Sequence, residues 1–254
     1  PDDEGFFCHR LKDDYIKRYS GPDTHPDSIR KNKLQVIENK DLLLKYNLLI
    51  SHRRLSIRDV SSYGHQPMIS SCETYIIAYN GEIYNFDKLK TELIKKNYLF
   101  KSNSDTEVLL NGFIEWGESI LNKLNGMFSF IIYNKKKKTI FIARDRFGIK
   151  PLYYYIKNNN LFFASEIKQF SKLTNWEAIL NNERAYDYLC FAQTDHTNET
   201  MFEDVFQVPS GHFCEFSICN IPKKLEFKQW YFLKKNKFKG SLKEATEKLK
   251  FLFK

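Results

Sequence analysis

The sequence predicts an α+β fold, and three observations lead to that prediction. Apolar runs of strand length come in pairs joined by polar turns, and stretches with helical spacing stand between them. Aromatic residues make up 16% of the 254 residues, and Phe and Tyr favour pleated, half-buried surfaces. Apolar residues make up 42%, which is enough for a sizeable core and argues against a mainly disordered chain.

The sequence predicts an irregular segment at the start of the chain. Residues 1–47 are charged and rich in turn signals, so we predict a long excursion there. Strands are predicted at residues 48–57 and 74–79. The second strand runs into Asn80 and Gly81, which predict a tight turn because both residue types tolerate positive φ.

Two helices follow in the prediction. Asn85 is a candidate N-cap for a helix over residues 86–96. The apolar side chains that share one face of this helix are Phe86, Leu89, Leu93 and Ile94. Ser104 and Glu107 match a capping box ahead of a second apolar stretch with helical spacing, so a helix is expected to start there.

Strand pairs dominate the rest of the chain. Hairpins are predicted for residues 127–133 with 139–143, across a lysine-rich turn, and for residues 152–156 with 161–164. Weaker patterns predict a short helix after residue 165, a helix at 183–191, strands at 213–218 and 226–232, and a helix from residue 241 onward.

Charge and cysteine content exclude several classes of protein. The net charge is +9, which we interpret as a lysine-rich solvated surface, and we expect no nucleic-acid partner. No apolar run approaches the roughly 18 residues that a membrane span needs. The five cysteines include no Cys-x-x-Cys pair, so we expect reduced thiols in a cytoplasmic protein and no metal site. The chain starts at Pro1 rather than Met, so we expect that upstream residues have been removed.

Three positions carry residue types suited to binding an amino acid, and each has a structural alternative. Arg54 can hold a carboxylate bidentately, or it can lie on the surface at a strand end. Asn80 with Gly81 can form an oxyanion hole, or simply a turn. Asp105 can bind a substrate ammonium, since Ser104 and Glu107 already account for the cap, or it can serve only the helix dipole.

Taken together and in order, four segments resemble one family, the glutamine-hydrolysing asparagine synthetases. The segments are residues 52–57, 80–85, 104–107 and 143–154, with weaker likeness at 1–5, 64–68, 163–167 and 206–212. These enzymes are class II glutamine amidotransferases with an N-terminal-nucleophile glutaminase domain. The resemblance implies two stacked antiparallel sheets flanked by helices, with the first strand missing from this chain. It also implies a glutaminase domain at residues 1–232 with 8–46 as a long insertion, and a lead-in helix at 233–254 to a missing synthetase domain.

The resemblance also implies roles for individual residues. Arg54 and the backbone that follows it would hold the α-carboxylate of glutamine, a set comprising Arg54, Leu55, Ser56, Ile57 and Arg58. Asn80 and Gly81 would form the oxyanion hole, with Glu82 beside the substrate. Asp105 would pair with the α-ammonium group. The segment at residues 144–154 would be a scaffold near the contact with the second domain, and on physical grounds we also interpret it as structural.

The chain departs from the family pattern in ways that affect activity. The family's nucleophile is a cysteine whose own α-amine is the general base, and it would lie upstream of Pro1. Cys8 with His9 is an alternative nucleophile and base that we do not favour. No Ser-Gly-Gly-x-Asp-Ser nucleotide loop occurs, so ATP and Mg²⁺ would bind the missing synthetase domain and no cofactor would bind this chain. We therefore predict that the chain alone is catalytically inactive.

Several functions stay open beside asparagine biosynthesis, in which the parent protein would amidate aspartate. One is a non-catalytic glutamine-binding or interaction scaffold. Another is an amidotransferase that acts on a different carboxylate, for example in surface polysaccharide synthesis. The amidotransferases that make amino sugars or phosphoribosylamine fit the segments at 54–57 and 144–154 poorly. The sequence leaves open whether the protein forms a homodimer.

Overall fold

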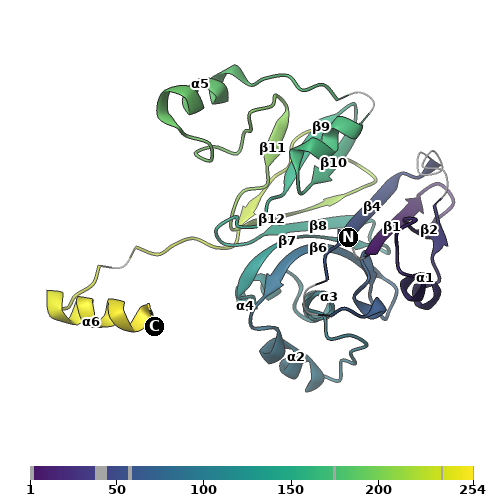
Figure 1. Cartoon of the computed structure of the whole chain (residues 1–254), viewed down its shortest axis with the longest axis horizontal. Helices are drawn as coiled ribbons and strands as arrows, with labels where there is room; N and C mark the ends of the chain where they lie inside the picture. The colour runs from purple at the N-terminus through teal and green to yellow at the C-terminus, as the bar shows by residue number, and fades with distance from the viewer. Residues whose placement is uncertain (1–2, 38–44, 57–58, 174–175, 236, 254) are drawn as a thin grey trace.

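Three sheets and six helices are seen in the computed structural model, which describes residues 3–37, 45–56, 59–173, 176–235 and 237–253 (Figure 1). A six-stranded antiparallel sheet in the order β13–β12–β8–β7–β6–β5 forms the centre. Its strands are β5 (Met68–Ile69), β6 (Tyr75–Ile83), β7 (Gly126–Asn134), β8 (Thr139–Arg144), β12 (His212–Ser217) and β13 (Lys228–Gln229).

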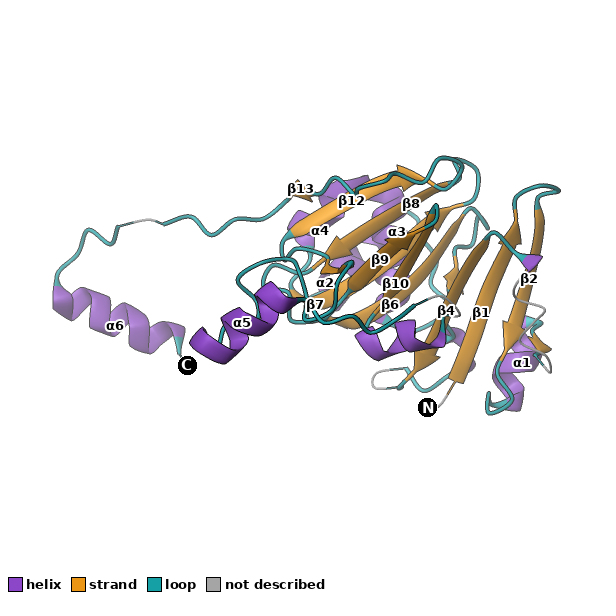
Figure 2. Ribbon diagram, turned by 90° about the horizontal axis from the view of Figure 1, so that it is seen from above, coloured by secondary structure: helices purple, strands orange, loops and turns teal. Residues whose placement is uncertain are grey.

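Two smaller sheets complete the β structure, and Figure 2 shows them beside the central one. One has the order β3–β2–β1–β4 and the other β10–β9–β11. The strands of the first are β1 (Asp3–Arg10), β2 (Tyr15–Ser20), β3 (Gln35–Val36) and β4 (Leu48–Arg54). Those of the second are β9 (Tyr153–Lys157), β10 (Asn160–Ala164) and β11 (Val205–Gln207). Every pairing is antiparallel except that of β2 with β3.

The helices are short. They are α1 (Pro26–Asn32), α2 (Phe86–Ile94), α3 (Asp105–Trp116), α4 (Ile120–Lys123), α5 (Asn182–Phe191) and α6 (Leu242–Leu252). Single 3₁₀ segments are η2 (Ser62–Gly64), η3 (Gly117–Ser119) and η4 (Ile167–Lys172). Within the described ranges, no helix is both long and apolar enough to cross a membrane.

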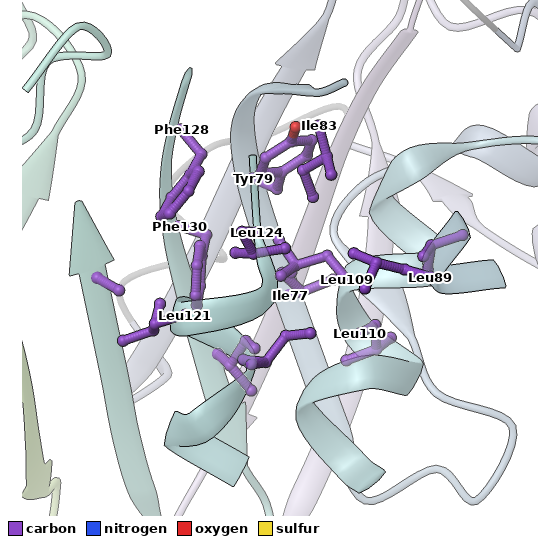
Figure 3. Packing of buried hydrophobic residues seen from close by; sticks show 14 of the residues in the cluster. Ile77, Tyr79, Ile83, Leu89, Leu109, Leu110, Leu121, Leu124, Phe128 and Phe130 are labelled. Carbon is purple, nitrogen blue, oxygen red and sulfur yellow. The ribbon is translucent and has the colours of Figure 1, made fainter. Parts of the chain in front are cut away.

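The core follows from the alternation of side chains along the central strands. On β6, Ile77 and Tyr79 face α2, α3 and α4, and they belong to one cluster with Leu109 on α3 and Phe128 on the neighbouring strand β7 (Figure 3). Ile76 points to the opposite face and belongs to the cluster shared with the smaller sheets. The central sheet is therefore covered on both faces, by helices on one side and by sheet on the other. This confirms the predicted arrangement of stacked antiparallel sheets with flanking helices.

Most predicted elements are confirmed with small shifts at their ends. The hairpin of β7 and β8, the hairpin of β9 and β10, and the helices α2, α3, α5 and α6 all form where the sequence predicts them. The strand predicted at residues 226–232 is only Lys228–Gln229. Ile94, expected on the buried face of α2, is 54% exposed.

The prediction of an irregular segment over residues 1–47 is wrong for its described part. Asp3–Arg10 form β1, and residues 15–36 contain β2, α1 and β3. The reason is a small core of their own, in which Tyr19 and Ile37 pack with Cys8. Charged residues between these positions hide the alternation in the sequence.

The turn predicted at Asn80 and Gly81 is also wrong, because β6 runs straight through both residues to Ile83. Gly81 pairs with Phe128 on β7. A Cβ at this glycine would collide with the carbonyl oxygen of Met127, so glycine is needed for the close approach of two strands.

The helix caps agree with the prediction only in part. Ser104 caps α3, since its Oγ accepts the N–H of Thr106 at 3.1 Å, whereas Glu107 turns away to the backbone of residues 101–102. The side chain of Asn85 does not cap α2. It instead bonds the carbonyl of Lys123 and the N–H of Asn125, which ties α2 to the start of β7.

Two helices lie outside the cores. α5 and α6 contain no buried residue, and α6 lies away from the sheets at the end of an extended segment (Figures 1 and 2). A substitution that weakens a helix should therefore lower the stability of the protein more in α3, which has buried residues, than in α6, which has none.

Replacing Ser104 by Ala is expected to lower the free energy of unfolding by about 1 kcal/mol, because α3 loses its N-cap bond while the helix is packed in the core. Urea unfolding monitored by tryptophan fluorescence measures the loss. The matched control is Ser241→Ala, which removes the same bond from α6 and should leave the midpoint unchanged. Equal losses in the two variants would contradict the assignment of α6 outside the cooperative core.

Candidate functional site

Arg54 is the last residue of β4, and its side chain is buried rather than lying on the surface. Its Nη1 donates to the carbonyl of Ser61 at 2.9 Å, and its Nη2 donates to the carbonyl of Asp59. Gly64 packs on the guanidinium, because a Cβ there would collide with Nη2. The turn of residues 59–64 therefore fixes the guanidinium at the end of β4.

The carboxylate of Asp59 joins this turn to the start of α3. Its Oδ1 accepts the N–H of Ser61 at 2.7 Å, and its Oδ2 accepts the N–H of Asn103 at 2.9 Å. Partial burial favours the neutral carboxyl, but the bonds from Ser61 and Asn103 and the charge of Arg54 outweigh it and hold the pKa of Asp59 below its ordinary value. The ionised carboxylate of Asp59 thus links the turn of residues 59–64, called the arginine turn below, to the start of α3.

Asp105 is the first residue of α3 and is buried, where the helix dipole favours a negative charge. Its Oδ2 accepts the hydroxyl of Tyr79 at 2.8 Å and the N–H of Ile83 at 3.0 Å. Sequence reasoning leaves Asp105 free for a ligand because the helix cap does not need it, but this oxygen already accepts two hydrogen bonds from β6, which runs beside the helix start. A role of Asp105 in binding an ammonium group stays a prediction.

Tyr79 is the residue at which these elements meet. Its N–H donates to Oε1 of Gln66 at 2.8 Å, its carbonyl lies 3.1 Å from Nε2 of His52, and its hydroxyl bonds Asp105. Since Asn80 follows directly, the structure brings the dipeptide at 80–81 next to the end of β4 and to the start of α3. The three predicted segments are neighbours in space.

His52 is held in its neutral form at this junction. Burial lowers the pKa of His52 from 6.5 to about 4. Because a carbonyl can only accept, the proton is on Nε2, which donates to Tyr79, and Nδ1 is an acceptor. Nδ1 is buried and has no hydrogen-bond partner within the described part of the chain.

The remaining predicted residues fall into three groups. Asn80, Gly81 and Glu82 lie within β6 opposite residues 127–129 of β7. Leu55 and Ser56 follow β4, and Leu55 is largely exposed. Ile57 and Arg58 lie outside the described residues.

Cys8 is unsuited to nucleophilic catalysis, and the alternative of Cys8 with His9 is wrong. Cys8 is fully buried on β1, and burial raises the pKa of its thiol to about 12. His9 is buried too, and both ring nitrogens are engaged, Nδ1 with the hydroxyl of Tyr133 and Nε2 with the carboxylate of Asp14, each at 2.8 Å. Neighbouring strand residues point to opposite faces, so the two side chains do not meet.

The segment at residues 144–154 is a scaffold, as its physical interpretation predicts. The carboxylate of Asp145 accepts the N–H groups of Phe128, Phe147, Ile149 and Lys150. Arg144 donates to the carbonyls of Gly148, Lys150 and Val208. These bonds fix the backbone that follows β8. β8 pairs with β7, and β7 pairs with β6 at residues 80–81.

Sequence reasoning missed the residues that join the site: Asp59, Gln66, His52 and Tyr79. Gln66 and His52 stand in segments that carry the family resemblance, and this is the one signal that could have singled them out. Their roles depend on contacts with β6, far away in the sequence, which no local pattern encodes.

Comparison with known proteins identifies the domain. A family model described as "Glutamine amidotransferase domain" matches residues 37–231. Asparagine synthetase [glutamine-hydrolyzing] 1 of Bacillus subtilis is 39% identical over 175 residues, which cover 62% of this chain and 27% of that protein. Asparagine synthetase B of Escherichia coli is 42% identical over 123 residues, covering 48% of this chain and 22% of that protein. The chain thus spans about a quarter of the length of these relatives.

The fold has counterparts among solved structures. Glutamine phosphoribosylpyrophosphate amidotransferase from B. subtilis superposes with a TM-score of 0.59 at 17% identity, covering 91% of this chain and 44% of that chain. At this identity the likeness concerns the fold alone.

The neutral His52 predicts a pH dependence of stability. As pH falls from 6.5 towards about 4, the unfolded chain binds a proton at this histidine and the folded chain does not, so stability falls; below about 4 both states bind it and the loss ends. His52→Gln should lose stability less steeply than the wild type across this window, as measured by urea unfolding at half-unit pH steps. Ser51→Ala, an exposed neighbour on β4, should keep the wild-type slope. Parallel curves for His52→Gln and the wild type would contradict the buried neutral state.

Proposed function

From the premise that the chain belongs to the glutamine amidotransferase domain family, we propose that it is the glutamine-binding unit of a glutamine-hydrolysing asparagine synthetase. The proposal is carried by two connections between distant parts of the chain. Tyr79, next to the dipeptide at 80–81, bonds His52 on β4 and Asp105 on α3. Asp59, whose carbonyl holds Arg54 at the end of β4, bonds the backbone at the start of α3. Arg54, the dipeptide and Asp105 are a cation, an amide with a glycine, and an anion. Glutamine offers the complementary groups.

Each of the two charged α-groups of glutamine has a counterpart in this set. The guanidinium of Arg54 would bind the α-carboxylate, for which its planar fork of donors is suited. The carboxylate of Asp105 would attract the α-ammonium group while Tyr79 and Ile83 hold it in place. With both α-groups bound, the side-chain amide of the substrate would extend along β6.

The reaction at that amide is acyl transfer. As a nucleophile attacks the amide carbon, negative charge develops on the carbonyl oxygen, and the Asn80 amide and the Gly81 N–H would donate to it. The strand pairing with β7 would hold these donors in place before the reaction, so that little reorganisation is needed. Cys8 is unsuited to be that nucleophile, because it is buried and its thiol pKa is raised.

In the parent protein, the ammonia released would amidate aspartate at an ATP- and Mg²⁺-dependent synthetase domain. The similarity to asparagine synthetases that hydrolyse glutamine supports this acceptor. A glutamine-binding scaffold without catalysis, or transfer of ammonia to another carboxylate, would use the same groups of this chain.

Arg54→Lys is expected to weaken glutamine binding roughly ten- to a hundredfold, because a point charge replaces the bidentate fork. Isothermal titration with glutamine measures the affinity, and circular dichroism checks that the variant is folded. Arg53→Lys is the matched control, since this neighbouring side chain is exposed on the other face of β4. Unchanged affinity in Arg54→Lys would reject the assignment of the carboxylate site.

Residues 1–254 expressed alone are expected to bind glutamine without hydrolysing it. A chain extended upstream to a cysteine with a free α-amine should release ammonia faster by several orders of magnitude, because nucleophile and base act as a unit. A coupled assay for glutamate compares the two proteins. Equal rates would show that chemistry takes place within the 254 residues, and the role of the upstream cysteine would then be rejected.

A further inference from the structure

Helix α1 contacts the turn that holds the Arg54 guanidinium. The side-chain amide of Asn32, the last residue of α1, donates to the carbonyl of Ser62 at 3.0 Å and to the carbonyl of Ser28 in its own helix at 3.1 Å. Lys31 adds a second contact, with its Nζ 4.9 Å from the centre of the Tyr63 ring. Both contacts reach η2, which lies in the arginine turn.

The contact with Ser62 is one residue away from the groups that hold Arg54. The carbonyl of Ser61 accepts from Nη1, and Gly64 packs on the guanidinium. The N–H of Gly64 in turn donates to the carbonyl of Ser61 at 3.2 Å, which closes the turn. A shift of the Ser62 peptide would therefore move both surfaces that fix the arginine.

α1 is itself anchored to the sheet, so it can act as a brace. Arg18 on β2 donates to the carbonyl of Asn32 at 3.0 Å. At the other end, the hydroxyl of Thr24 donates to the carbonyl of Glu4 at 2.9 Å, and the N–H of Glu4 bonds the same hydroxyl. β1 and β2 thus hold both ends of the segment that carries Asn32.

We propose that Asn32 is a positioning residue for the α-carboxylate of glutamine, acting through Ser62 on the turn that orients Arg54. This inference rests on the proposed function, because it takes Arg54 as the carboxylate-binding group. The segment of residues 15–36 is then part of the substrate site rather than a separate surface feature. Its effect is specific to ligands that carry the α-carboxylate.

The test is Asn32→Asp, which keeps the shape of the side chain but replaces the Nδ2 donor by an acceptor facing two carbonyl oxygens. Glutamine affinity should fall about tenfold, the usual size for one lost hydrogen bond. The affinity for the analogue in which a carboxamide replaces the α-carboxylate of glutamine should stay within about twofold of the wild type. If Asn32→Asp fails to fold, Asn32→Ala serves in its place.

Arg30→Ala is the matched control, because it removes an exposed ion pair with Asp27 from the same helix and should change neither affinity. Equal weakening of both ligands by Asn32→Asp would indicate a structural role and overturn the inference. Unchanged glutamine binding in Asn32→Asp beside a weakened Arg54→Lys would overturn it too, with the proposed function intact. Unchanged binding in Arg54→Lys would overturn both.

Discussion

The hydrogen bonds of Tyr79 are the constraint on which the site depends. The carbonyl of Tyr79 bonds His52 on β4, and its N–H bonds Gln66 in the loop before β5. Its hydroxyl bonds Asp105 at the start of α3. The bonds with Gln66 and Asp105 are buried and the bond with His52 is partly buried, and an unsatisfied buried partner costs about 1–3 kcal/mol. The arrangement of the charged groups is therefore coupled to the packing of the central sheet, and it cannot change without breaking core contacts.

Local signals in the sequence were enough for much of the fold. The lysine-rich turn between apolar runs predicts the hairpin of β7 and β8, and Ser104 predicts the start of α3, because each signal lies within the element it defines. Arg54 and Asp105 could also be singled out as candidates, since each is a charged residue at the predicted end or start of an element, although their burial could not be predicted.

Other features depend on partners far away in the sequence. The dipeptide at 80–81 has the composition of a turn, but pairing with β7 along the whole of β6 outweighs the local preference. Similarly, Asp105 has no sequence signal for its bonds to Tyr79 and Ile83, which form only when β6 passes the helix. The strand at Tyr15–Ser20 was missed because its burial comes from contacts with β1 and with Ile37.

The pairing of β2 with β1 has a consequence for how such a domain tolerates change. In the order β3–β2–β1–β4, β2 covers the side of β1 that does not pair with β4. An uncovered strand offers a row of vacant N–H and C=O groups on which another molecule can add its own strand. Removal of residues 15–36 would thus leave this edge of β1 unpaired and prone to aggregation, and this gives selection a reason to keep the segment whatever the domain binds.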